Sequence, residues 1–250
     1  MPSPPGKPSN ATTLRLIAQR PLVDSRAAAT HRNESDNGEA VPEDTRLNAM
    51  LDLLRAGQPI VDWAFDAIYP DWLSLLSPRH WTPLDVARRA AKMLVLDPGT
   101  RVLDVGSGVG KFCLIGAIST PATFTGIEQR GHLVDVAKAV AARYGVTRAS
   151  YLHGDMRDID WTQFDAFYFF NSFGENRLEV DHRIDNSVEL SQERFERDVP
   201  VVLSRLERAR IGTRVVTYYG LGASLPTNYE LCAAELAGTD VLELWVKVRS

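Results

Sequence analysis

The segment between residues 102 and 111 constrains the fold more than any other part of the chain. It reads Val-Leu-Asp-Val-Gly-Ser-Gly-Val-Gly-Lys, a short apolar run followed by glycines at three alternate positions, 106, 108 and 110. Glycine permits a tight turn and lets the backbone approach a ligand where a Cβ atom would clash. A helix that follows such a turn presents free N–H groups and the positive end of its dipole. We therefore predict a strand–turn–helix unit that binds a ligand at Gly106, Gly108 and Gly110.

Two common nucleotide-binding loops do not fit this turn. A phosphate-binding P-loop needs glycine five residues before its Gly-Lys pair and serine or threonine after it, where this chain has Val105 and Phe112. A dinucleotide-binding loop needs glycine at the place of Lys111. The pattern Asp-x-Gly-x-Gly-x-Gly, which begins at Asp104, instead resembles motif I of the class I, or seven-β-strand, S-adenosylmethionine-dependent methyltransferases.

Glu128, Asp155 and Asn171 each stand at the end of a strand-like run. An acid at the end of the second strand of a βαβ unit binds the ribose hydroxyls of a nucleoside, which favours this role for Glu128. The alternative for Glu128 is a solvated carboxylate at a helix N-terminus. Through the resemblance, Asp155 is expected to bind the adenine amino group and Met156 to pack on the ring. The order of these strand ends extends the resemblance over residues 80–220.

The resemblance implies an α/β fold with a Rossmann-like, doubly wound, mostly parallel seven-stranded sheet and an N-terminal helical cap. Residues 213–219 are expected to form the fifth strand, and residues 228–236 and 241–248 a closing antiparallel hairpin. The implied cofactor is S-adenosyl-L-methionine. Its expected binding residues are Thr82, Asp104, Gly106, Ser107, Gly108, Gly110, Glu128, Gln129, Asp155, Met156, Asn171 and Phe173.

Within the class, the motifs are most similar to the non-SET histone-lysine methyltransferase group and its small prokaryotic relatives. In that group an Asn-Asn-Phe-type segment lines the methyl-transfer channel, whereas this chain has Asn171, Ser172 and Phe173. Amino-methylating enzymes with an Asn-Pro-Pro-aromatic segment are a second partial match, and both prolines are missing here. The resemblance therefore supports the reaction class more than the acceptor.

The implied reaction is in-line displacement of the sulfonium methyl group by an acceptor, which rests on positioning and exclusion of water. We favour an amine of a small molecule or a protein lysine as acceptor. The candidate catalytic residues are Asn171 to orient the acceptor, Glu175 as base, and Tyr218 to orient or deprotonate it. The alternative is a non-catalytic module that binds S-adenosylmethionine or acts in assembly. A nicotinamide-dependent oxidoreductase is disfavoured by Lys111.

Composition is compatible with a single globular domain, because 44% of the 250 residues are hydrophobic and 24% are charged. The net charge of −4 argues against a nucleic-acid partner held by a large basic surface. Two cysteines and five scattered histidines indicate neither a disulfide framework nor a metal site. The sequence contains no run of 18 apolar residues, so it predicts no membrane span. We expect a cytoplasmic protein. The sequence leaves the oligomeric state open.

The chain divides into three predicted parts. Residues 1–43 are rich in Pro, Ser, Thr, Ala and Asn and are expected to be a disordered extension, either a transit-like segment or a flexible tail. Residues 44–82 form a helical cap, with a helix over 45–56 that ends at Gly57. Residues 83–250 form the methyltransferase domain, with a polar loop at 175–189 and a charged helix at 190–208.

Aromatic residues concentrate in the cap, and as a group they are expected to cover one side of the site; they are Trp63, Phe65, Tyr69, Trp72 and Trp81. Thr82 and Pro83 predict the start of a helix, with threonine as N-cap and proline at the first helical position. The segment Trp81-Thr82-Pro83 also resembles the aromatic-Thr-Pro segment that several methyltransferase families place against the methionine part of the cofactor. Both readings of Thr82 stay open.

Overall fold

The structure is a computed structural model that describes residues 43–250, with side chains described from residue 48. The predicted N-terminal extension therefore lies outside the described residues, apart from Glu43, which begins the first described helix. No helix among the described residues is long and apolar enough to cross a membrane.

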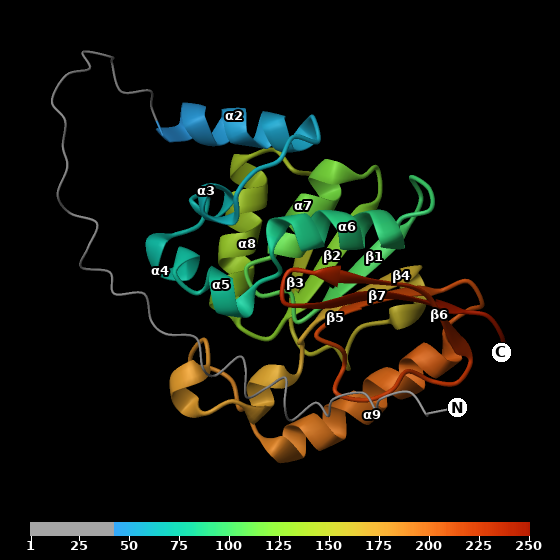
Figure 1. The fold of residues 1–250 in the computed structure, drawn as a ribbon. Coiled ribbons are helices and arrows are strands. Elements are labelled where there is room, and N and C mark those ends of the chain that lie inside the picture. The colour runs from blue at the N-terminus through green and yellow to red at the C-terminus, as the bar shows by residue number, and fades with distance from the viewer. Residues whose placement is uncertain (1–42) are drawn as a thin grey trace, which may run out of the picture. The chain divides into compact units, whose positions relative to one another are not determined.

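A seven-stranded sheet in the order β3-β2-β1-β4-β5-β7-β6 forms the centre of the described chain (Figure 1). The first five strands pair in parallel, and β7 runs antiparallel between β5 and β6. The predicted mixed sheet and closing hairpin are confirmed. The strands are β1 (Arg101–Val105), β2 (Thr123–Glu128), β3 (Ala149–His153), β4 (Ala166–Phe170), β5 (Arg214–Tyr218), β6 (Tyr229–Ala237) and β7 (Asp240–Lys247).

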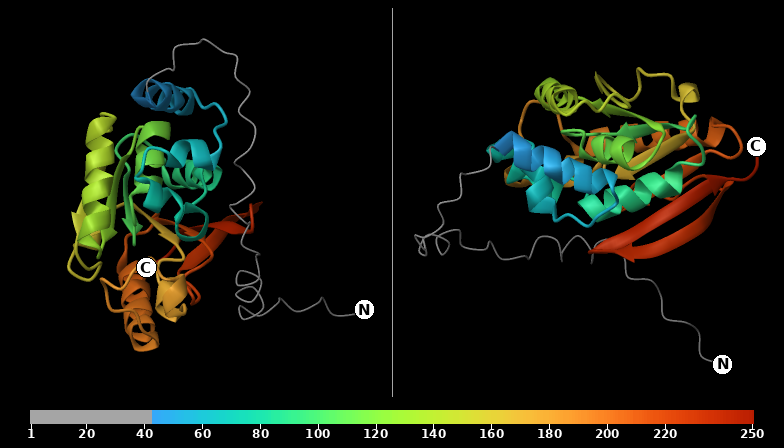
Figure 2. Two further views of the ribbon diagram at one scale, coloured as in Figure 1. Left: turned by 90° about the vertical axis from the view of Figure 1, so that its left-hand side faces the viewer. Right: turned by 90° about the horizontal axis from the view of Figure 1, so that it is seen from above.

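Helices cover both faces of the sheet, as a doubly wound fold requires. One face packs against α6 (Leu84–Leu94), α7 (Lys111–Ser119) and α8 (Gly131–Arg143) in a large apolar cluster. The other face packs against α9 (Gln192–Arg208), which Figure 2 shows well separated from the cap. The central strands are apolar on both sides because both faces are covered, and β1 and β4 are buried along almost their whole length.

The cap consists of four helices: α2 (Glu43–Arg55), α3 (Asp62–Asp66), α4 (Asp71–Ser74) and α5 (Ser77–His80). Gly57 has a φ of 74°, a left-handed conformation that suits the predicted stop after α2. Of the cap aromatics, Phe65, Tyr69 and Trp81 are buried in the large apolar cluster. Trp63 is 78% exposed and Trp72 is 51% exposed. The five aromatics therefore do not form one cover, and the prediction that they act as a group is wrong.

The start of α6 differs from the predicted cap. The helix begins at Leu84, and its backbone N–H donates to Asp62 Oδ1 of α3 at 2.8 Å. Thr82 does not cap the helix, because its hydroxyl is hydrogen-bonded to the buried Tyr168 hydroxyl at 2.9 Å. Pro83 precedes the helix instead of occupying its first position. An acid from a distant helix thus takes the place of the local threonine, which a sequence pattern does not reveal.

The segment after β4 is a polar connection, as predicted, with short helical turns η2 (Gly174–Arg177) and η3 (Val180–His182). A further short turn, η1 (Trp161–Gln163), precedes β4. Ser191 caps α9, since its hydroxyl accepts a hydrogen bond from the Arg194 backbone N–H at 3.1 Å. This cap brings the first turn of α9 to the carboxyl ends of β2 and β3.

Candidate cofactor site

The glycine turn after β1 needs glycine for two separate reasons. Gly106, Gly108 and Gly110 have φ values of 78°, 54° and 75°, which L side chains rarely adopt. A Cβ atom on Gly108 would lie 2.7 Å from Trp81 Nε1, and one on Gly110 would lie 2.2 Å from Tyr151 Cε1. The turn is therefore enclosed by an indole from the cap and a phenol from β3.

Lys111, directly after the turn, does not face a ligand. Its ammonium group is buried and lies 2.6 Å from Asp62 Oδ1, 2.8 Å from Asp66 Oδ1 and 3.2 Å from Ser77 Oγ. This residue ties the cap to the start of α7, in agreement with the rejection of a P-loop.

Buried polar atoms without partners cluster around the glycine turn. Trp81 Nε1, Ser107 Oγ and Ser172 Oγ are buried, and none has a hydrogen-bond partner among the described residues. Trp81 Nε1 faces Gly108, and the Ser172 backbone and Cβ lie beside Gly106. An unpaired buried donor or acceptor costs about 1–3 kcal/mol, so such groups usually meet a partner. The residues around the turn thus fit a small polar ligand that completes these hydrogen bonds.

Glu128, at the end of β2, is buried and accepts two backbone hydrogen bonds. Gly108 N–H donates to its Oε2 and Arg130 N–H to its Oε1, each at 3.0 Å. The carboxylate thereby holds the turn in shape. Its oxygens keep capacity for further hydrogen bonds, since a carboxylate has about four acceptor positions. The ribose role predicted for Glu128 stays a prediction.

Asp104, on β1, is buried below the turn, and the Cys113 thiol donates to its Oδ2 at 3.6 Å. Burial raises the pKa of Asp104 to about 8, which leaves the carboxyl largely protonated at neutral pH. A protonated carboxyl donates as well as accepts hydrogen bonds. The cofactor-binding role expected for Asp104 stays a prediction.

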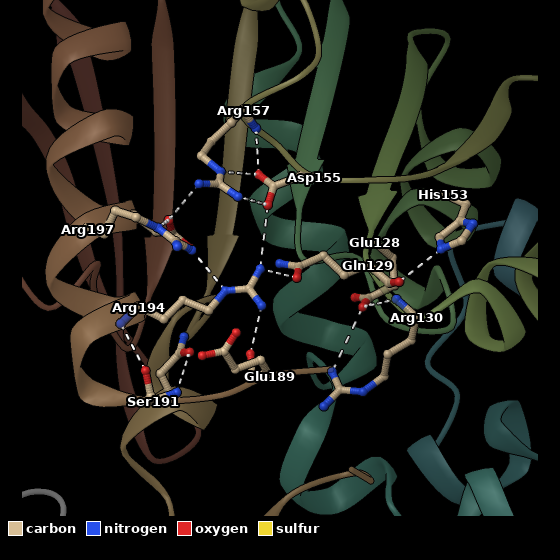
Figure 3. A network of polar contacts seen from close by, with 12 residues as sticks. Glu128, Gln129, Arg130, His153, Asp155, Arg157, Glu189, Ser191, Arg194 and Arg197 are labelled. Atoms are coloured by element: carbon tan, nitrogen blue, oxygen red, sulfur yellow. Dashed lines mark hydrogen bonds and ion pairs between the residues drawn. The ribbon is translucent and has the colours of Figure 1, made fainter. Parts of the chain in front are cut away.

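A network of arginines and carboxylates surrounds the ends of β2 and β3 (Figure 3). The Arg130 side chain is 5% exposed, and it lies 2.8 Å from Glu175 Oε1 and 3.0 Å from Asp185 Oδ1. Ile184 N–H also donates to Glu175 Oε1, at 2.7 Å. Burial raises the pKa of Glu175, and Arg130 opposes that rise. Because Glu175 is committed to Arg130 and Ile184, the structure does not support it as a free catalytic base.

Asp155 belongs to the same network. Both of its oxygens accept from the Arg157 guanidinium, at 2.9 and 2.7 Å, and Oδ1 also accepts the Arg157 backbone N–H at 2.9 Å. These hydrogen bonds lower the pKa of Asp155. Arg194 contacts both Gln129 and Asp155. The neighbouring Met156 is buried, and its carbonyl accepts the Trp161 indole N–H at 2.8 Å.

Asn171, at the end of β4, has a positive φ of 46° and is exposed. Its N–H donates to Tyr218 O at 3.2 Å, and its carbonyl accepts from Gly174 N–H at 2.9 Å. Its side chain covers Gly174, where a Cβ atom would lie 1.9 Å from Asn171 Oδ1. Phe173 is buried against the α9 face of the sheet.

Tyr218 is 1% exposed, and its hydroxyl donates to Ala237 O at 2.5 Å. The structure buries this side chain in the large apolar cluster, against Ala237 at the end of β6, and so does not support the prediction that Tyr218 takes part in catalysis. A tyrosine at the end of a strand can expose its hydroxyl to a substrate or bury it against the closing hairpin. The sequence does not distinguish these two arrangements.

Three residues at the site have no predicted role in the sequence analysis: Arg130, Ser172 and Arg194. Ser172 enters there only as a departure from a motif. Arg130 and Arg194 give no local signal, because their partners lie far away in the chain. Trp81, in contrast, is expected at the site through the Trp81-Thr82-Pro83 segment, and its unpaired indole N–H agrees with that expectation.

Comparison with known proteins gives a match to one domain family and similarity to solved structures of methyltransferases. Residues 96–197 match the model of a family described as a methyltransferase domain. The structure of TrmN from Thermus thermophilus superposes with a TM-score of 0.50 at 17% identity, over 67% of this chain and 49% of TrmN. The described part of the chain has the class I methyltransferase fold. S-adenosyl-L-methionine is the methyl donor of this class.

Two further solved structures are similar at lower TM-scores. An RNA methyltransferase from Salinibacter ruber, in complex with S-adenosyl-L-homocysteine, has 20% identity and a TM-score of 0.49 over 68% of this chain and 94% of that one. The putative methyltransferase yhhF from Escherichia coli has 14% identity and a TM-score of 0.46, over 66% and 84%. No curated protein matches the chain.

Proposed function

We propose that this protein is an S-adenosylmethionine-dependent methyltransferase. The observation that carries the proposal is the set of buried, unpaired polar atoms around the glycine turn: Trp81 Nε1, Ser107 Oγ and Ser172 Oγ. A nucleoside amino acid with a carboxylate, an ammonium group and hydroxyls supplies partners for all three. When bound, it also supplies a methyl group on a sulfonium, which an acceptor displaces in line.

The residues in and around the turn have different roles in binding the cofactor. Gly106, Gly108 and Gly110 let the backbone approach the cofactor, and Glu128 accepts from the ribose hydroxyls while it holds the turn. Trp81, a donor only, provides an N–H for the carboxylate of the methionine part. Thr82 acts indirectly, because its hydroxyl is bonded to Tyr168 below the site.

The acceptor proposed is an amine, of a small molecule or a protein lysine. Asn171 supports this class, because it is exposed at the carboxyl edge of the sheet and offers an amide carbonyl that accepts from an amine N–H. The partial match of Asn171-Ser172-Phe173 to the histone-lysine methyltransferase group points the same way. Positioning and exclusion of water supply the rate, with no base among the described residues assigned.

A specific observation favours the second candidate, a non-catalytic module that binds the cofactor. The carboxylates of Asp155 and Glu175 are already paired with arginines, so neither is free to receive a proton from an acceptor. A protein that only binds the cofactor or acts in assembly would show the same pairing of these carboxylates with arginines.

Calorimetric titration with S-adenosylmethionine, S-adenosylhomocysteine and NAD tests the cofactor. Binding of the first two without NAD supports the proposal, and binding of NAD alone contradicts it. A labelled-methyl assay then compares amines, small acids, protein lysines and RNA as acceptors. Transfer to an amine supports the acceptor class, and transfer to RNA alone contradicts it. Cofactor binding without any transfer favours the non-catalytic module.

Asn171→Ala separates catalysis from folding once an acceptor is known. If Asn171 orients the acceptor, cofactor affinity stays within a few-fold of wild type while methyl transfer slows about 10²-fold, as loss of near-attack geometry does. If Asn171 only forms the turn after β4, stability falls and the rate per folded molecule is unchanged. Thermal unfolding and saturating single-turnover rates measure both quantities.

A further inference from the structure

The side chain of Arg194 extends from the first turn of α9 across the ends of β2 and β3 (Figure 3). Its Nη2 contacts Gln129 Oε1 after β2 and lies 3.5 Å from Asp155 Oδ2 after β3. The side chain is only 11% exposed. Gln129 and Asp155 are both expected cofactor-binding residues, and Asp155 is the one expected to bind the adenine amino group. The guanidinium thus occupies the space between two residues of the expected cofactor site.

Asp155 has little capacity left for a nucleobase in this arrangement. Arg157 supplies two hydrogen bonds to Oδ1 and one to Oδ2. A carboxylate accepts about four hydrogen bonds, and the contact with Arg194 takes the remaining position. An adenine amino group can therefore reach Asp155 only after Arg194 has moved.

Arg194 has partners to which it can withdraw. Its Nε lies 3.3 Å from Asp198 Oδ2 on the next turn of α9, and its Nη1 donates to Glu189 O at 2.7 Å. Asp198 is buried and also pairs with Arg197 at 2.9 Å. Rotation of the guanidinium away from Gln129 therefore leaves neither the arginine nor Asp198 as an unpaired charge.

We propose that Arg194 is a gate on the nucleobase part of the cofactor site: it closes the space between Gln129 and Asp155 and must leave before a nucleoside binds. This inference rests on the proposed function. A gate lowers apparent affinity by the fraction of molecules in the open state, and it does so through the association rate. A residue that simply contacts the nucleoside would act on dissociation instead.

The experiment compares Arg194→Met with Arg197→Met in the full chain, with S-adenosylhomocysteine as the probe. Arg197 is the matched control, because it lies on the same helix and pairs with Asp198 but contacts neither Gln129 nor Asp155 in the structure. Stopped-flow fluorescence gives association and dissociation rates. We expect Arg194→Met to bind about 3- to 10-fold faster and correspondingly tighter, with dissociation unchanged. Arg197→Met should match wild type.

A variant that keeps the charge provides a second measurement. Arg194→Lys serves if the methionine variant does not fold. This variant keeps the charge, but its single nitrogen spans Gln129 and Asp155 less well. Its association rate should therefore lie between those of wild type and Arg194→Met.

The outcomes separate the gate from the proposed function. Wild-type binding with no faster association in Arg194→Met or Arg194→Lys overturns the gate alone. Weaker binding of Arg194→Met through faster dissociation also overturns it, since Arg194 would then be a cofactor contact. Binding to Arg194→Met but not to wild type supports the gate strongly. If neither wild type nor the Arg194 variants bind, the proposed function fails and the gate fails with it.

Discussion

The glycine turn at residues 106–110 and the segment from Glu175 to Asp198 meet at the same edge of the sheet, but different forces hold them. The turn is shaped by backbone conformation and by close contacts with Trp81 and Tyr151. The segment is held by arginines that reach carboxylates on other elements, through Arg130 and Arg194. The turn is thus a rigid steric feature, and the segment is an electrostatic attachment.

The difference matters for what each region is able to do. A turn in which two added Cβ atoms would overlap a neighbouring ring has one conformation available. An ion-pair network has alternatives, because an arginine that leaves one carboxylate can keep another. Arg194, for example, lies near both Asp155 and Asp198. We infer that the turn fixes where the ligand lies, whereas the segment controls access to it.

Removal of the Arg130 charge is expected to have the largest effect. Arg130→Met leaves Glu175 and the buried Glu128 without their cation, and breaking a buried pair by deleting one partner costs about 3 to 5 kcal/mol. Urea denaturation measures the loss. Arg208→Met is the control, since within the described part of the chain its guanidinium donates hydrogen bonds only to Ser204, on its own helix. Equal stabilities of the two variants would show that the segment is not held electrostatically.

The contrast between the two regions also explains what the sequence predicts. The arrangement of the sheet is implied by the resemblance to class I methyltransferases. The individual strands, the closing hairpin and the glycine turn follow from local patterns, such as apolar runs and alternate glycines. These patterns act over a few residues, and the structure agrees with them. They also place Glu128 at the end of a strand, although its hydrogen bonds to Gly108 and Arg130 have no signal in the sequence.

The predictions that the structure contradicts or does not support concern residues whose partners are distant in the sequence. Thr82 bonds to Tyr168 while Asp62 caps α6, Glu175 is claimed by Arg130, and Tyr218 by Ala237. In each case the residue type suits the predicted role, but a contact with a residue distant in the sequence gives the side chain a different role. A single sequence does not contain the pairing information that these contacts require.

Gly110→Ala tests the steric side of the comparison. The added methyl group would lie 2.2 Å from the Tyr151 ring, in a backbone conformation that already disfavours a side chain. Overpacking and the left-handed φ together are expected to cost about 2 to 4 kcal/mol. Gly145→Ala is the matched control, because Gly145 has a φ of 63° but no atom within 4 Å of the added Cβ. It should lose only about 1 kcal/mol, and an equal loss in both would refute the steric account.

Glu128→Ala tests the point where the two regions join, since Glu128 contacts both Gly108 and Arg130. We expect the affinity for S-adenosylmethionine to fall by about 1 to 3 kcal/mol, through loss of charge-assisted hydrogen bonds. Glu128→Gln, which keeps one acceptor oxygen, should lose less. Titration calorimetry on folded protein measures both, and unchanged affinity in Glu128→Ala would remove this residue from the site.

The last comparison is between two aspartates: Asp104 lies below the glycine turn, and Asp155 contacts Arg194 of the segment. Burial raises the pKa of Asp104 to about 8, whereas hydrogen bonds from Arg157 lower the pKa of Asp155. An aspartate in the unfolded chain titrates near about 4, so from about pH 4 to 8 the unfolded chain releases a proton that folded Asp104 keeps. Stability should therefore fall as pH rises through this window, by at most about 1.4 kcal/mol per unit, and level off above it.

Asp104→Asn retains an acceptor for the Cys113 thiol but does not titrate, so its unfolding free energy should lack this decline. Asp155→Asn should keep the decline, because Asp155 is already ionised across the window and its loss only shifts the curve. Denaturation at half-unit intervals of pH measures all three proteins. Parallel curves for wild type and Asp104→Asn would mean that folded Asp104 is ionised, and that an acid below the turn carries charge without the arginine partner that Asp155 has.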